Sequence, residues 1–172
     1  MKTYLLPLVL MVAASVENSS AQSLNPGNLQ VEGLVEGGTC DLVPGEYDRP
    51  VVLPPARVSD FAGSESTGHR SFEISAHCDS DITSVTFTFS GTQADDGARF
   101  ANTGDAQGIG LWLYSRLGGV QRTIRADGSD STRTLSPSGG QAVLPLGAAY
   151  WKTGNVREGT LVSQATVEIT YN

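Results

Sequence analysis

Short segments in which apolar and polar residues alternate run through almost the whole chain, and no long segment repeats with a helical period. Alternation with a period of two is typical of a β-strand with one buried face. Glycine, serine, aspartate and threonine fill the gaps between these segments. The pattern favours a single all-β domain, an antiparallel β-sandwich of immunoglobulin type. The expected strands lie at 29–35, 50–53, 71–78, 82–89, 109–117, 120–125, 142–146 and 161–171.

The beginning of the chain has the features of an export signal. A lysine at position 2 precedes an apolar run at 4–14, and small residues follow at 19–21. This order is typical of a secretory signal peptide, and the run of about ten residues is too short for a membrane span, which needs about 20. We expect residues 1–21 to be removed, with a cut after Ala14 as the alternative. The mature protein is then exported, soluble and without a membrane span.

The mature chain of 151 residues (172 less 21) is long enough for one domain with a substantial core. Removing the signal takes away one lysine and one glutamate, so the net charge stays at −7. An acidic exported domain is a poor candidate for binding nucleic acid or anionic lipid. We therefore expect no nucleic-acid partner.

The two cysteines, Cys40 and Cys78, form an even number in an oxidising compartment, which favours a disulfide. It would close a loop of about 39 residues and contribute roughly 4 kcal/mol in the chain-entropy model. Two buried free thiols are the alternative. A structural zinc site needs four ligands, and His69 and His77 are the only histidines, so we expect no metal.

Three segments are superficially similar to sites of chemistry, and each has a simpler interpretation. The Gly63–Gly68 segment lacks the Gly-x-Ser-x-Gly spacing of a nucleophile elbow. The Asp127–Asp130 segment lacks the ligand spacing of a calcium loop and is typical of a tight turn. No predicted helix follows the glycines of Gly104–Gly110 to bind a phosphate. We expect no enzyme activity and no cofactor.

The two ends of the mature chain carry matching apolar faces. One face of the final strand consists of Ala165, Val167, Ile169 and Tyr171. A further strand would normally lie beside it in an immunoglobulin-type sandwich, but Asn172 is the last residue of the sequence. Near the other end, after the polar segment 22–28, one face consists of Leu29, Val31, Gly33 and Val35. These strands could pair within one chain or between chains, and the residues leave both possibilities open.

A series of motifs follows in order along residues 29–172. It comprises Gly33-x-Val35-x4-Cys40, Val51-Val52-Leu53, Phe72-x-Ile74-x3-Cys78-Asp79, Val85 to Thr92, Gly108 to Leu111, Leu144-Pro145-Leu146-x-Ala148-x-Tyr150, Gly154, Gly159 and the penultimate Tyr171. In order and spacing the sequence resembles the fimbrial subunits of the chaperone–usher pathway, the type 1 pilin family. Single motifs are weak, whereas their order and the distance between the cysteines are specific.

The resemblance implies an incomplete immunoglobulin-like sandwich whose missing last strand leaves a groove. A periplasmic pilus chaperone would lend a strand to this groove. At the outer-membrane usher, the N-terminal arm of a neighbouring fimbrial subunit would replace the chaperone's strand. Repetition of this exchange would build a fibre on the cell surface that supports adhesion. Chaperone–pilin complementation is itself a known example of strand addition.

The resemblance also implies a role for each end of the chain. Leu29, Val31, Gly33 and Val35 would form the donated strand, and Ala165, Val167, Ile169 and Tyr171 would line the groove and contact the chaperone. Cys40 and Cys78 match the family's disulfide. The domains would be a signal peptide (1–21), a donor extension (22–36) and a pilin domain (37–172). Burying the three larger donor side chains at about 1.5–3 kcal/mol each would contribute roughly 5–9 kcal/mol.

An alternative is a self-contained exported β-sandwich that binds carbohydrate or protein without polymerising. Its candidate sugar platform consists of Trp112, Tyr114, Tyr150 and Trp151. Core or subunit-contact roles are the more common use of such aromatic residues.

Overall fold

The structure is a computed structural model and describes residues 32–48 and 50–172. The chain divides into two units, residues 1–35 and 36–172. The described residues of the first unit, 32–35, form no helix or strand, and the side chains of Leu34 and Val35 are exposed. The fold lies in the second unit.

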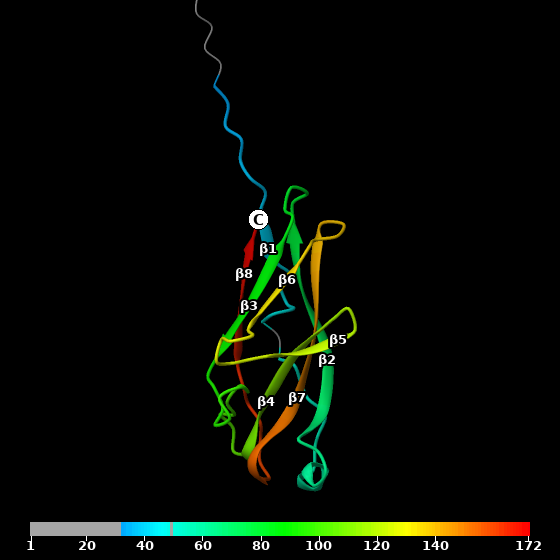
Figure 1. Cartoon of the computed structure of the whole chain (residues 1–172), viewed down its shortest axis with the longest axis vertical. Helices are drawn as coiled ribbons and strands as arrows, with labels where there is room; N and C mark the ends of the chain where they lie inside the picture. The colour runs from blue at the N-terminus through cyan, green and yellow to red at the C-terminus, as the bar shows by residue number, and fades with distance from the viewer. Residues whose placement is uncertain (1–31, 49) are drawn as a thin grey trace, which may run out of the picture. The chain divides into compact units, whose positions relative to one another are not determined.

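In the described part of the second unit, eight strands form two antiparallel sheets (Figure 1). The five-stranded sheet has the order β1 (Cys40–Leu42), β2 (Ser66–Cys78), β7 (Gln141–Arg157), β4 (Gln107–Leu117) and β5 (Val120–Ile124). The three-stranded sheet has the order β6 (Thr132–Leu135), β3 (Val85–Gly91) and β8 (Ala165–Tyr171). A short 3₁₀ helix, η1 (Val58–Phe61), precedes β2. The predicted all-β antiparallel sandwich is confirmed.

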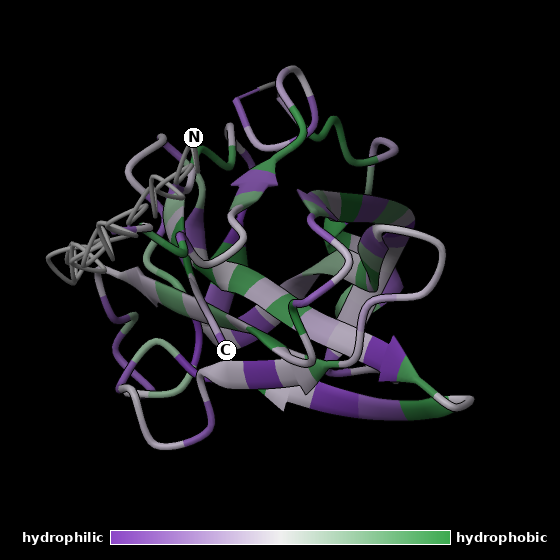
Figure 2. Cartoon of the chain, turned by 90° about the horizontal axis from the view of Figure 1, so that it is seen from above, coloured by the Kyte–Doolittle hydropathy of each residue, from purple (hydrophilic) through white to green (hydrophobic). Residues whose placement is uncertain are grey.

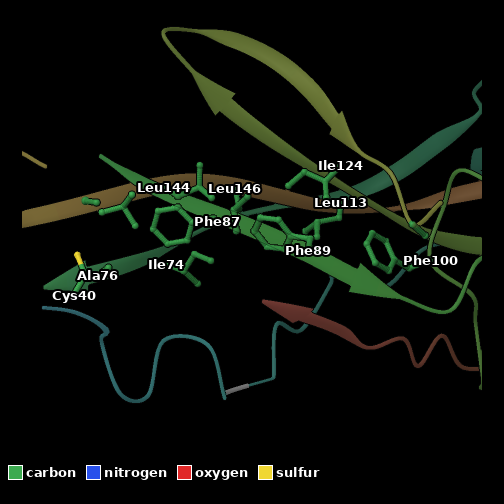
Figure 3. Packing of buried hydrophobic residues seen from close by; sticks show 13 residues of the cluster. Cys40, Ile74, Ala76, Phe87, Phe89, Phe100, Leu113, Ile124, Leu144 and Leu146 are labelled. Carbon is green, nitrogen blue, oxygen red and sulfur yellow. The ribbon is translucent and has the colours of Figure 1, made fainter. Parts of the chain in front are cut away.

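The core lies between the two sheets (Figure 3). Phe87 and Phe89 of β3 are buried against side chains of the opposite sheet, among them Ile74, Leu113, Ile124, Leu144 and Leu146. Apolar and polar bands alternate along the strands (Figure 2), as expected for sheets with one buried face. Within the described ranges no helix reaches the length and apolar character needed to cross a membrane.

Several strands differ from the expected ones. Residues 50–53 form no strand, and β6 was not expected because its sequence, Thr-Arg-Thr-Leu, has a single apolar residue. Strand β7 continues 11 residues beyond the expected end at Leu146, through Gly147 and two alanines. The small residues serve packing here, since a Cβ at Gly147 would collide with the ring of Tyr114 on β4.

The predicted disulfide between Cys40 and Cys78 is present and joins β1 to β2 at residues that are direct partners in the ladder. Next to it, the turn after β2 binds the main chain just before β1. The amide of Thr39 donates to Asp79 Oδ2 at 2.7 Å, and the amide of Gly38 donates to Asp81 Oδ2 at 2.8 Å. The first residues of the second unit are thereby tied to the sandwich.

Candidate functional site

Strand β8 lies at the edge of the three-stranded sheet and pairs with β3 along its whole length, from Ala165 opposite Gly91 to Tyr171 opposite Val85. Among the residues that the structure describes, no strand pairs with its other edge. An unpaired edge exposes a row of main-chain donors and acceptors and is a template for pairing with another chain.

The residues predicted to line a groove share one face of β8. The side chains of Ala165, Val167 and Ile169 are half-buried and pack against the main core, whereas the intervening Thr166 and Glu168 are exposed. Tyr171 is 43% exposed, so it lies at the rim rather than within the core. The alternation predicted for the final strand is therefore present along β8.

A cavity of about 600 Å³ opens beside the first half of β8. One wall is formed by residues 161–165 and Val167, and the other by residues of the irregular segment between β1 and η1. The floor is the inner face of the sandwich, made of Phe72, Ile74, Phe89, Leu111, Leu113, Leu146 and Ala148. The core is thus open to the outside along this edge. We call this space the acceptor groove.

Two polar side-chain atoms of residues that line the acceptor groove are themselves buried, away from its open space, and have no hydrogen-bond partner among the described residues. They are Oε2 of Glu46, on the irregular wall, and Oγ of Ser163, on the wall that continues β8. Nothing in the sequence distinguished these residues, because their position depends on how two distant segments approach each other.

The end of β8 is fixed to the start of β3. The main-chain oxygen of Asn172 accepts hydrogen bonds from the amide of Thr83 at 2.7 Å and from the amide of Ser84 at 3.0 Å. The hydroxyl of Thr83 donates to the same oxygen at 2.9 Å. The groove wall is therefore held in place at the Tyr171 end.

The predicted donor residues are only partly described. Leu29 and Val31 lie outside the described residues. Gly33 and Val35 lie within them, and neither belongs to a strand. Their role in donation stays a prediction.

Three of the four aromatic residues considered as a sugar platform lie together, because Trp112 contacts Trp151 and also Tyr114, whose ring centroid is 4.7 Å away, but Tyr150 lies apart from them. Trp112 and Trp151 contact each other on the outer face of the five-stranded sheet, with ring centroids 5.0 Å apart, and the guanidinium of Arg99 lies 3.7 Å from the centroid of Trp151. Tyr150 packs instead with Phe61 beside the inner face. Successive side chains of β7 point to opposite faces of the sheet, so Tyr150 and Trp151 lie on different faces. This arrangement argues against a four-residue platform.

Comparisons with known proteins show which family this chain is similar to. The sequence profile of the family described as fimbrial protein matches residues 28–172. The S-fimbrial adhesin protein SfaS of Escherichia coli is 35% identical over 160 residues, covering 88% of both chains. The type-1 fimbrial protein A chain of Escherichia coli is 24% identical over 186 residues, covering 99% of this chain and 100% of the relative.

Solved structures share the fold. The P pilus rod subunit PapA superposes with a TM-score of 0.60 at 19% identity, covering 77% of this chain and 99% of that one. A subunit in a structure of a chaperone–usher pilus superposes with a TM-score of 0.63 at 16% identity, covering 90% and 100%. Together with the profile match over most of the sequence, the relative at 35% identity shows that this chain belongs to the fimbrial protein family and is a fimbrial subunit.

Proposed function

We propose that this fimbrial subunit joins its neighbours by strand exchange, and that the acceptor groove receives the apolar N-terminal arm of the next subunit. The observation that carries this proposal is the cavity beside the unpaired edge of β8, which opens onto the core. A β-strand laid in the groove would pair with β8 and cover apolar side chains of both sheets.

The arm suits this role. Leu29, Val31, Gly33 and Val35 present one face with the strand period, and the groove face of β8 has the same period. In the absence of a neighbour the open edge is an aggregation hazard, so a periplasmic chaperone would cover it first. An outer-membrane usher would then be the site at which the arm replaces the chaperone strand.

The same proposal includes the domain organisation of the protein and its location in the cell. Residues 1–21 would direct export, 22–36 would be the donor extension, and 37–172 the pilin domain. The subunit would pass through the periplasm and become part of a fimbria at the cell surface. A role in adhesion is supported by the name of the relative at 35% identity, a fimbrial adhesin. The subunit would act by binding alone and not as an enzyme.

A pair of matched substitutions in the arm tests strand exchange. Val31→Asp places a carboxylate on the donated face, where burial without a partner is costly, and should abolish the joining of subunits. Leu34→Asp introduces the same group on the opposite face and should leave joining nearly unchanged. The measurement is the length distribution of fibres assembled in cells that express the chaperone and usher.

Export and chaperone binding serve as the internal control, because both variants should reach the periplasm and bind the chaperone equally well. Fibres of normal length from the Val31→Asp variant would exclude the arm as the donated strand.

A further inference from the structure

The wall of the acceptor groove begins before β8. Residues 161–164 line the cavity but belong to no strand. Strand β3 supports β8 only as far as Gly91, which lies opposite Ala165. The part of the wall before Ala165 therefore needs a different support.

Residues 102–106, which we call the supporting loop, hold this part of the wall. The loop runs antiparallel to residues 160–162, as β3 does to β8. The amide of Thr103 donates to the oxygen of Val162 at 2.7 Å, and the amide of Ala106 donates to the oxygen of Thr160 at 3.1 Å. The hydroxyl of Thr103 also donates to the Val162 oxygen, at 3.1 Å. The loop thus supports the wall where β3 no longer does.

The half-buried side chain of Asn102 is at the centre of these hydrogen bonds. Its Oδ1 accepts from the amides of Val162 and Gly104, both at 2.8 Å. Its Nδ2 donates to the carbonyl of Ala106 at 2.8 Å and to that of Thr160 at 3.2 Å. One side chain therefore fixes both the shape of the supporting loop and its contact with the wall.

Two glycines allow the supporting loop and the wall to approach each other closely. A Cβ at Gly104 would collide with the main-chain oxygen of Thr160, and a Cβ at Gly159 would collide with the main chain of Ala106. A side chain at either position would push the two segments apart. The first glycine of the Gly104–Gly110 segment is thus needed for packing against the groove wall.

The support matters because the wall lies beside an open apolar cavity. Side chains that line an empty space lack contacts on one side, and a segment that is free to relax moves into the space. A relaxed wall would narrow the groove before a strand arrives. Only the fraction of molecules with an open groove could then accept a strand, and the apparent affinity would fall by that fraction.

We propose that Asn102 is a positioning residue for strand exchange, which holds residues 160–162 so that the groove is open before the donated strand arrives. It acts through the wall and does not need to touch the donor. The proposal rests on strand exchange and adds the residue that keeps the groove ready.

The binding kinetics of a fluorescent peptide of residues 22–36 with the mature chain test this role. Asn102→Ala should slow association about tenfold, as expected if the groove is open in about one tenth of the molecules. Dissociation should stay unchanged, because the bound peptide itself holds the wall. Asn155→Ala is the matched control, since Asn155 is an exposed asparagine of β7 outside the lining of the groove. It should bind as the unmodified chain does.

A second pair of variants disturbs the same contact from its main chain, in case the Asn102→Ala variant does not fold. Gly104→Ala places a methyl group against Thr160 and should also slow association alone. Gly63→Ala is its control, because a Cβ at Gly63 meets open space, and it should leave both rates unchanged.

Urea unfolding of each variant separates positioning from a purely structural role. A lower urea midpoint with unchanged association in the Asn102→Ala and Gly104→Ala variants would overturn the proposal but leave strand exchange intact. Faster dissociation with unchanged association would also overturn it, because Asn102 would then stabilise the bound state rather than prepare the free one. If the unmodified chain does not bind the peptide, the groove accepts no arm from another copy, and strand exchange fails as well.

Discussion

Arg133 on β6 is a charged residue inside the sandwich, with 3% of its surface exposed. Its Nε donates to Ser115 Oγ on β4 at 2.6 Å, and Nη2 donates to the carbonyl of Thr123 on β5 at 2.7 Å. Nη1 donates to Asp130 Oδ1 at 2.9 Å. Burial lowers the pKa of Arg133, and the charge of Asp130 opposes this effect. The guanidinium therefore joins the edges of the two sheets opposite the acceptor groove.

Arg133→Ala should lower the free energy of unfolding by about 3 kcal/mol, because it leaves Ser115 and a β5 carbonyl buried without their donors. Urea unfolding of the mature chain measures this loss. Arg122→Ala is the matched control, since its 60% exposed side chain bonds the same Asp130, and it should cost less than about 1 kcal/mol. Similar losses in both variants would mean that Arg133 contributes little more than a surface ion pair.

For single residues, the sequence predicted burial where apolar and polar side chains alternate along a strand. It did not predict burial that depends on contacts with residues distant in the sequence. The half-buried Ala165, Val167 and Ile169 follow from a period of two. Arg133, Glu46 and Ser163 could not be recognised, because arginine, glutamate and serine are usually exposed and only the folded chain buries them.

The turn between β5 and β6 depends on an ionised carboxylate. Hydrogen bonds from the Arg125 guanidinium, and then from the amide and hydroxyl of Ser129, hold the pKa of Asp127 well below its usual range. A lowered pKa means that the ionised group contributes stability above the unfolded pKa, near 4, and that this stability is lost as the pH falls through the folded value.

The mature chain should therefore lose stability between about pH 4 and pH 2 through this turn, and Asp127→Asn should make the loss shallower. The measurement is the urea midpoint at several pH values, with Asp95→Asn, an exposed acid in another loop, as the control. Parallel pH profiles for the Asp127→Asn variant and the unmodified chain would show that the turn does not contribute.

The sequence predicted where strands occur more accurately than it predicted where they end. Strand β7 was expected to end at Leu146 because Gly-Ala-Ala is a poor strand sequence on local propensity. In the fold, Gly147 and Ala149 lie opposite Tyr114 and Trp112 of β4 and leave room for those rings. Residues 50–53 have strand composition, yet they form no strand and contribute to one wall of the acceptor groove. Both errors arise from neighbours that are distant in the sequence.

On the scale of the whole sandwich, the two lateral edges differ. Arg133 joins β6 to β5 at one edge, whereas at the other the acceptor groove separates β8 from the irregular segment after β1. The two matching apolar faces left pairing within one chain or between chains open, and only the family resemblance implied an open groove. Nothing in the sequence indicated which segment forms the second wall. A sandwich closed at one edge only should gain stability from any ligand that completes the other.

A synthetic peptide of residues 22–36 should therefore stabilise the mature chain. If it binds the folded state alone, a peptide concentration of 100 times Kd adds about 2.7 kcal/mol, which corresponds to a Tm increase of roughly 5–10 °C for a domain of this size. Thermal unfolding at several peptide concentrations measures the increase, and a peptide with Val31→Asp is the control. A Tm that is independent of peptide concentration would mean that the groove is already filled by the chain's own arm, because a closed groove has no site left for the peptide.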